Sequence, residues 1–388
     1  MDLFEALILT MDDSNNGKVC PIVNMLKKIK IRGVNTFRIE LFIFVLQIEN
    51  HKKIQEMMKN MYLLLALCLG LLAGCKPTDP QAFRIEKVLT PEFMPLKGLT
   101  DPFRVEIKHP YLLLQNSPKL RDSIFHVYDL RNNELKCVFG NIGQGPEEYV
   151  MPWLMNSQFP EFVIQEKQSF QKFSINKDGQ AVMMDNVTPA FQISLDKAQF
   201  IHDSLFVVNP AYEGIPYMLM SDMKHDEPIK AYAYRDTTLF NYAADPDRVD
   251  YMFANQDRIM LCYSYKKQID FMDTDFNLVK RVTFDDYVPK YEWRNPDEHK
   301  PSYEKGYLGK RYLYLLFMGC TYNEMKAKDD KGSYLEVFDF DGNPIARYEL
   351  QGERPRYFAV DEETFILYSP MKGLPEDHLM VYKLEGLK

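Results

Sequence analysis

The sequence lacks the residue patterns of a metal or redox site. Its six cysteines include no C-x-x-C pair and join no histidine cluster, and its seven histidines form neither H-x-x-x-H nor H-E-x-x-H. Zinc sites need such spacings, because short stretches of chain must bring several ligands to one ion. The serines also lack the G-x-S-x-G turn that presents a nucleophile in many hydrolases. We therefore expect no metal site and no set of catalytic residues.

Positive charge and helical periodicity are also scarce. The formal net charge is −8 and the pI is about 5.5. This argues against nucleic acid as a partner, since phosphate neutralisation needs a basic surface. Hydrophobic residues make up 46%, enough for a full core, and the 24 Tyr and 26 Phe favour β-structure. From Phe83 onward, short apolar runs alternate with turn residues, a pattern that predicts an all-β protein.

A unit of about 50 residues repeats six times in this region. Each unit opens with an apolar run, and the first core residues of these runs are Leu112, Phe162, Leu205, Ile259, Leu313 and Phe365. A second apolar segment follows each run, and a third follows the first five. The sixth unit therefore lacks its third segment.

Residues 82–89, "AFRIEKVL", are the natural donor of the missing strand. A ring closed by strands from both ends of the chain leaves few exposed sheet edges. With an inner strand before each unit, such as "FRVEI" from Phe103, every blade has four strands. We therefore predict a six-bladed β-propeller over residues 83–388, with four-stranded antiparallel blades and an N-terminal strand completing the last one. The alternative, two β-sandwich domains, explains neither the six-fold count nor the missing strand.

Residues 57–75 resemble a bacterial lipoprotein signal peptide. Lys59 gives a basic start, a run of about a dozen apolar residues is too short to span a membrane, and "LAGC" ends it at Cys75. In such proteins the cysteine becomes the lipidated first residue of the mature chain. We expect lipidation at Cys75, a tether over residues 76–82, and a location in the cell envelope, anchored to a membrane on its periplasmic or outer side. The alternative is a buried core helix with an incidental cysteine.

The 56 residues before this segment are unexpected for a protein with a signal peptide. They lack the turn-punctuated pattern of the later chain. We predict that translation starts at Met57 or Met58 and that residues 1–56 are a mis-assigned upstream extension. A genuine cytoplasmic or membrane extension is the alternative.

The stretch "FGNIGQGPEEYV", residues 139–150, superficially resembles a nucleotide-binding glycine loop. Its glycines follow the order G-x-x-G-x-G, whereas the dinucleotide fingerprint is G-x-G-x-x-G before a helix. Pro146 and Pro152 block such a helix. We instead predict that this glycine loop crosses from the outer strand of blade one to the inner strand of blade two, on the face that usually binds ligands in propellers.

The same stretch is similar to the hallmark "FG-x-x-G-Q-G-P-G-E-[FY]" of the TolB-like six-bladed β-propeller lipoproteins, common in Bacteroidetes. The matching residues are Phe139, Gly140, Gly143, Gln144, Gly145, Pro146, Glu148 and Tyr149. Glu147 stands where the family usually has glycine, and residues 311–319 resemble a second family segment. The resemblance covers about residues 83–388. It implies the fold and the location and carries no catalytic residues.

The largest departure from the repeat is the segment 285–310, predicted on the same face as the glycine loop. Aromatic rings mixed with polar groups suit stacking on sugars or peptides, although an insertion that packs its own rings is the alternative. The predicted ligand-binding residues are Asn141, Gln144, Glu148, Tyr149, Trp153, Tyr291, Trp293 and Arg294.

Calcium is the one cofactor that the acidic turns suggest, since Ca²⁺ takes oxygen ligands. These turns contain Asp203, Asp257, Asp361 and Glu362. We expect them instead to be turn residues that face solvent on the side opposite the glycine loop, so that the protein needs no cofactor.

Together these patterns predict a lipid-anchored envelope propeller that binds a glycan fragment, a peptide or another envelope protein without bond chemistry. A hydrolase or lyase at the channel mouth is the alternative, and a strongly perturbed acid or base there would indicate it. A purely structural interaction module would show a broad apolar face instead.

Overall fold

A computed structural model describes most of the region from Ala82 onward. The described residues are 82–98, 101–117, 123–145, 148–191, 198–211, 214–215, 217–235, 245, 247–284, 288, 290, 292, 294–327, 333–370 and 378–388. They belong to one of the two units into which the chain divides, Asp79–Lys388. The expectations for the extension 1–56, the signal peptide 57–75 with Cys75, and nearly all of the tether lie outside the described residues.

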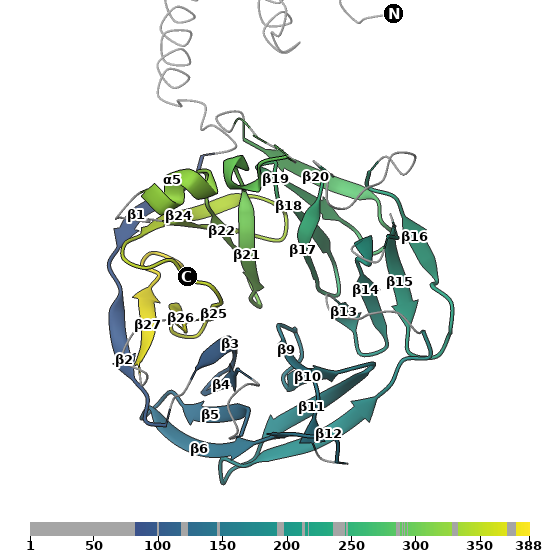
Figure 1. The fold of residues 1–388 in the computed structure, drawn as a ribbon, viewed down its shortest axis with the longest axis vertical. Coiled ribbons are helices and arrows are strands. Elements are labelled where there is room, and N and C mark those ends of the chain that lie inside the picture. The colour runs from purple at the N-terminus through teal and green to yellow at the C-terminus, as the bar shows by residue number, and fades with distance from the viewer. Residues whose placement is uncertain are drawn as a thin grey trace, which may run out of the picture. The chain divides into compact units, whose positions relative to one another are not determined.

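Six sheets stand around a ring as the blades of a β-propeller (Figure 1). In blades one to four the strands pair antiparallel and follow one another in chain order from the centre of the ring to its rim, and blades five and six each add an N-terminal strand at the rim. The strands of blades one to three are β3 (Pro102–Lys108), β4 (Tyr111–Asn116), β5 (Phe125–Asp129), β6 (Glu134–Phe139), β9 (Pro152–Met155), β10 (Phe162–Glu166), β11 (Ser169–Ile175), β12 (Ala181–Val187), β13 (Gln199–His202), β14 (Leu205–Val208), β15 (Met218–Asp222) and β16 (Lys230–Tyr232).

The strands of blades four to six are β17 (Val249–Ala254), β18 (Ile259–Tyr263), β19 (Gln268–Met272), β20 (Leu278–Thr283), β21 (Tyr303–Leu308), β22 (Leu313–Phe317), β23 (Ser333–Phe338), β24 (Pro344–Leu350), β25 (Ala359–Asp361), β26 (Ile366–Ser369), β27 (His378–Lys383) and β2 (Glu92–Pro95). This arrangement confirms the predicted six-bladed propeller with four-stranded antiparallel blades.

The ring closes through an N-terminal strand, as predicted, but not through the expected one. β2 completes blade six by pairing antiparallel with β27, with Phe93 opposite Met380. The expected segment forms β1 (Ile85–Leu89) and pairs parallel with β24, as a fifth strand at the rim of blade five. Both segments are short and partly apolar, so their sequences do not distinguish which sheet edge each one covers.

Burial between neighbouring blades explains the apolar runs of the repeat. β5, β18 and β22, which are middle strands of their blades, are buried at every position. The outer strand β12 is exposed at five of its seven positions. A sheet that is covered on both faces needs continuous apolar strands, which is the pattern seen in the sequence.

The core consists of apolar clusters between adjacent blades. One cluster joins Phe125 and Val127 of blade one to Leu154 and Phe162 of blade two. Among the described residues, helix is confined to the 3₁₀ turn η3 (Pro296–Glu298) and to α5 (Tyr322–Ala327). Neither of these two has the length and apolarity that a membrane span requires.

Candidate functional site

The glycine loop holds a carboxylate of its own. Its two ends, β7 (Asn141–Ile142) and β8 (Glu148–Tyr149), form a short parallel pair. The Glu148 side chain turns back into the loop, where Oε2 accepts a hydrogen bond of 2.7 Å from the Gly145 N–H. A Cβ atom at Gly143 would lie 1.8 Å from that oxygen. The glycines of this loop therefore make room for the Glu148 side chain.

Tyr149 lies in the core beneath this loop. Its ring is 5% exposed and packs edge-on against Phe125 at 5.4 Å, and its hydroxyl donates to Gln171 at 2.8 Å. Burial raises the pKa of this hydroxyl. Gly140 has φ of 74°, and a Cβ there would lie 2.9 Å from both rings. These residues of the hallmark therefore join blades one and two, and Tyr149 is buried in the core between them.

A cavity of about 350 Å³ occupies the central channel on the same face as the glycine loop. The inner strands begin at this face, because β9 directly follows the loop, and the cavity is lined by the beginnings of the inner strands from all six blades. Its polar and aromatic lining includes Arg104, Trp153, Gln199, Arg248, Asp250, Tyr251, Lys305 and Tyr357. The volume suits a small ligand, since ligand pockets span about 300–1,000 Å³.

Arg104 stacks between two aromatic rings of this cavity. Its Cζ lies 3.2 Å from the centroid of the Trp153 ring and 5.0 Å from that of Tyr357. Burial lowers the pKa of Arg104 to about 10, so the guanidinium is charged at neutral pH. Its Nε atom is buried without a hydrogen-bond partner in the described part of the chain.

Lys305 is the second cation against the Tyr357 ring. Its Nζ lies 5.0 Å from the centroid of that ring and donates a hydrogen bond of 2.7 Å to the Tyr251 hydroxyl. Burial lowers the pKa of Lys305, and the nearby charges of Arg104 and Arg354 lower it further, while Glu304 opposes them. Burial also raises the pKa of Tyr251.

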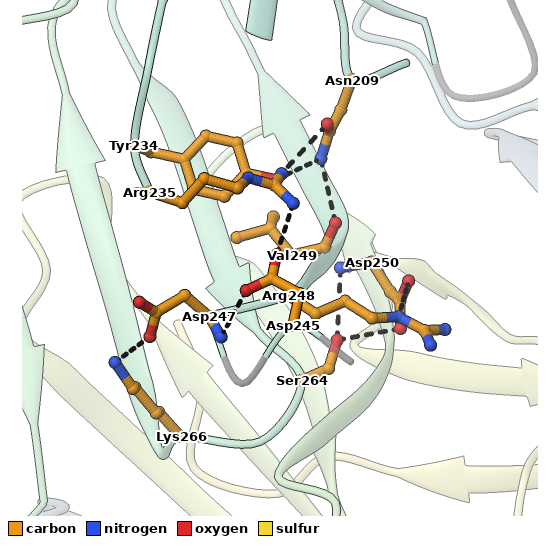
Figure 2. Close-up of polar contacts among 10 residues, drawn as sticks. All are labelled: Asn209, Tyr234, Arg235, Asp245, Asp247, Arg248, Val249, Asp250, Ser264 and Lys266. Atoms are coloured by element: carbon orange, nitrogen blue, oxygen red, sulfur yellow. Dashed lines mark hydrogen bonds and ion pairs between the residues drawn. The ribbon is translucent and has the colours of Figure 1, made fainter. Parts of the chain in front are cut away.

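Blade four supplies a wall of the cavity that polar contacts hold in place (Figure 2). Arg248 donates from Nε to Asp250 at 2.8 Å, and the Ser264 hydroxyl donates to the other Asp250 oxygen at 3.0 Å. In the loop before β17, the side chains of Arg235 and Asp245 pair at 2.5 Å. Such supported side chains are pre-organised and need not reorder when a ligand binds.

Asn156 closes the channel below this cavity. Its side-chain amide oxygen accepts a hydrogen bond of 2.8 Å from the Leu308 N–H, and its amide nitrogen donates one of 3.1 Å to the Leu308 carbonyl. These two bonds link blades two and five across the ring. Glu106 lies at this closure and is 1% exposed. Its carboxylate lies 3.1 Å from Lys108 Nζ and accepts a long hydrogen bond of 3.5 Å from the Tyr307 hydroxyl. Burial raises the pKa of Glu106 to about 7, and the Lys108 charge opposes this shift.

A second pocket, of about 260 Å³, opens on the opposite face, at the far ends of the inner strands. The prediction that Asp361 and Glu362 face solvent here is wrong, because they are 2% and 7% exposed. The Asp361 carboxylate lies 2.9 Å from His109 Nδ1, and the Glu362 carboxylate accepts a hydrogen bond of 3.0 Å from the Tyr314 hydroxyl. Burial raises the pKa of Glu362.

The other two acidic turn residues, Asp203 and Asp257, are exposed as predicted. In the part of the chain that the structure covers, no group of three or more His, Cys, Asp or Glu side chains is arranged to hold a metal ion.

The eight predicted binding residues fall into five groups. Trp153 lies in the cavity and is 38% exposed, whereas Tyr149 lies in the core. The glycine-loop residues Asn141, Gln144 and Glu148 are exposed on the face but do not line the cavity. Arg294 is exposed in the segment before β21. Tyr291 and Trp293 lie outside the described residues.

Of the cavity residues named above, Trp153 alone was predicted, and four of the others share a position in the repeat, namely Arg104, Tyr251, Lys305 and Tyr357. A positional signal for them exists in the sequence. They stand eight residues before the first core residues of their units, Leu112, Ile259, Leu313 and Phe365. Trp153 stands nine residues before Phe162. Polar or aromatic residues at this repeated position identify the lining of the channel.

A family model agrees with this fold. The family model described as "TolB-like 6-blade propeller-like" matches residues 85–363. A member of the DUF4221 family from Bacteroides vulgatus is similar over 76% of this chain and 97% of its own, at 13% identity and a TM-score of 0.47. The WD40 β-propeller domain of Doa1 is similar over 76% of this chain and 98% of its own, at 10% identity and a TM-score of 0.40. No functionally curated protein matches the sequence. Because the family model spans more than half of the sequence, this chain belongs to the TolB-like six-bladed propeller family.

Proposed function

We propose that the protein is a binding protein of the cell envelope whose central cavity, on the glycine-loop face, recognises a small ligand and performs no bond chemistry on it. A glycan fragment or the end of a peptide fits the size of the cavity. The exposed residues Asn141 and Gln144 would contact the remainder of a larger ligand or an envelope protein.

The single observation that carries this proposal is the lining of the cavity. The rings of Trp153, Tyr251 and Tyr357 stand beside the charged groups of Arg104 and Lys305. Aromatic rings next to fixed hydrogen-bond donors are typical of sites that bind sugars and peptides. The floor made by Asn156 and Leu308 favours binding at one mouth over passage through the ring.

The experiment is a screen of neutral and charged glycans, peptides and Ca²⁺ by thermal shift on the full-length chain, followed by titration. Trp153→Ala should weaken the binding of any ligand of the cavity about five- to tenfold, because stacking contributes on the order of 1 kcal/mol. Met184→Ala, on the exposed outer strand β12, is the control. A ligand that binds equally well to the parent and to Trp153→Ala does not use this site.

A second candidate function is a hydrolase or lyase in the channel. The observation that favours it is Glu106, whose pKa of about 7 suits proton transfer near neutral pH. Its carboxyl group, however, is 1% exposed and surrounded by Lys108, Asn156 and Tyr307. A substrate could reach it only after Asn156 moved, so binding remains the preferred function.

The location in the envelope is proposed from the segment that ends at Cys75. A lipid on this cysteine would hold the propeller at a membrane through the short tether that follows. Mass measurement of the native protein should give a chain that begins at a lipidated Cys75. A peptide from residues 1–50 in the native precursor would contradict the expected start at Met57 or Met58.

A further inference from the structure

No described carboxylate lies within ion-pair distance of two cations of the cavity, although the charges of Glu304 and Asp250 oppose the burial that lowers the pKa of Lys305. In the described part of the chain, neither Arg104 nor Lys305 forms an ion pair. Arg104 donates one long hydrogen bond, 3.5 Å from Nη1 to the Leu154 carbonyl. Lys305 donates to a neutral group, the Tyr251 hydroxyl, at 2.7 Å.

Other cations in or near the channel contrast with these two. Arg248 of the same cavity pairs with Asp250. Other ion pairs that involve half-buried or buried cations include Lys108–Glu106, Arg235–Asp245, Lys267–Glu336 and Arg354–Glu304. Pairing is the rule for such groups, because removing a charge from water costs free energy that a partner must offset. Two exceptions that line one cavity therefore point to a partner from outside the chain.

The two cations are also near each other. Arg104 Cζ and Lys305 Nζ both lie 5.0 Å from the centroid of the Tyr357 ring, so they are at most 10 Å apart. Like charges at this range repel, and the ring offsets only part of that repulsion. An anion between them would turn the repulsion into two attractions.

The orientation of Arg104 leaves hydrogen-bond donors for such an anion. A guanidinium carries five N–H donors in its plane. Its face is covered by the Trp153 ring at 3.2 Å, and one donor is used on Leu154. The remaining donors lie along the edge of the group, and this edge is what binds the paired oxygens of a carboxylate or a sulfate.

We infer that the ligand of this cavity is a small organic anion, whose carboxylate or sulfate group binds between Arg104 and Lys305 while its body packs on the rings of Tyr251 and Tyr357. This inference rests on the proposed binding function and specifies the class of ligand. An acidic sugar and the free carboxyl end of a peptide present the same chemistry.

The test compares anionic probes with matched neutral probes on the full-length chain. The pairs are glucuronate with glucose, and trialanine with its C-terminal amide; inorganic sulfate is compared with chloride at equal ionic strength. Calorimetry measures affinity. Fluorescence is read in a Trp293→Phe background, where Trp153 is the only one of the two tryptophans left. An anion that engages Arg104 should change the emission of the indole stacked on it.

Arg104→Gln and Lys305→Gln should each lower the affinity for the anion about 10- to 100-fold, as expected for the loss of a charge-assisted hydrogen bond. Lys305→Arg should retain most of the affinity. Arg131→Gln removes the same charge from an ion pair with Asp129 outside the cavity and should have no effect. Preference for glucuronate or for trialanine identifies the ligand as a saccharide or a peptide end.

Three results would overturn the inference: equal affinity for the anionic and neutral members of both pairs, an equal effect of Arg131→Gln and the two cavity variants, or no binding of any anionic probe. If a neutral ligand still binds in a way that depends on Trp153, the proposed function stands and only the anion inference fails. If no ligand of either kind depends on Trp153, both fail.

Discussion

Glu106 is a carboxyl group enclosed at the middle of the channel. It is 1% exposed, and the side chains of Lys108, Asn156 and Tyr307 surround it. Burial disfavours its charged form and raises its pKa from 4.5 to about 7, while the ion pair with Lys108 opposes the shift. A carboxyl group in this setting has two possible roles, a structural one in closing the channel and a chemical one in proton transfer. Its effect on stability distinguishes it from the exposed carboxylates of the surface.

We expect Glu106 to make the free energy of unfolding depend on pH. The folded state binds the Glu106 proton more tightly than the unfolded chain, so the contribution of this group is complete below pH 4.5 and is lost as the pH rises through about 7. Glu106→Gln cannot ionise, so its free energy of unfolding should fall less between these pH values than that of the parent, by about 3 kcal/mol at most. Urea denaturation at several pH values measures this.

Asp203→Asn, at an exposed turn, is the control and should follow the parent curve. If Glu106→Gln and the parent lost stability in parallel, the carboxyl group would not be held in its neutral form by the fold.

At the scale of elements, the glycine loop acts as a joint between two blades. Gly140 lets the chain turn over the rings of Phe125 and Tyr149, and Gly143 leaves room for the carboxylate of Glu148. The loop then leads directly into β9, which carries Trp153 into the cavity. The family hallmark therefore encodes the position of an inner strand, and this strand carries Trp153 into the cavity.

Two glycines with positive φ allow the packing at this joint to be measured. Gly140 has φ of 74° and a Cβ there would lie 2.9 Å from ring atoms, whereas Gly214 has φ of 84° and nothing within 4 Å. Gly214→Ala should cost about 1 to 2 kcal/mol of unfolding free energy, the backbone cost alone. Gly140→Ala should cost about 1 to 3 kcal/mol more, because the rings must also move. Equal costs in denaturant titrations would mean that the rings adjust freely.

At the scale of the whole molecule, two N-terminal strands serve two different blades. β2 completes blade six, while β1 covers the rim of blade five and approaches the C-terminus through the Lys87–Glu385 ion pair of 2.8 Å. Of the two strands, β2 is the one that pairs with a strand of the last blade. The closure of the ring and the protection of a sheet edge are therefore separate functions of neighbouring segments.

Two truncations separate these roles. A chain that begins at Thr90 lacks β1 but keeps β2, and it should remain a folded monomeric ring with a reduced Tm. A chain that begins at Leu96 lacks both strands, which leaves the edge of β27 open. It should lose at least about 3 kcal/mol more, a further fall in Tm of roughly 6 °C or more, and should associate through the open edge. Thermal melts and size-exclusion chromatography measure both effects. Equal Tm values for the two chains would show that β2 does not close the ring.

Much less of the site than of the fold could be predicted. Trp153 was identified because it follows the glycine loop, whereas Arg104 and Lys305 are ordinary charged residues in their local sequence. Asp361 and Glu362 were expected in solvent because they occupy a hairpin turn, yet the neighbouring blades bury them. Turn chemistry describes the local backbone and does not report what packs over it.

The sequence by itself determined the number of blades, the order of their strands and the turns between them. Those features depend on apolar runs and turn residues within about 50 residues of chain, and such patterns are local. Only the tertiary structure decided which edge β1 and β2 cover and which side chains meet in the cavity. Arg104, Trp153, Tyr251, Lys305 and Tyr357 come from five different blades. They meet because the inner strands converge on one axis, and this convergence is a property of the closed ring.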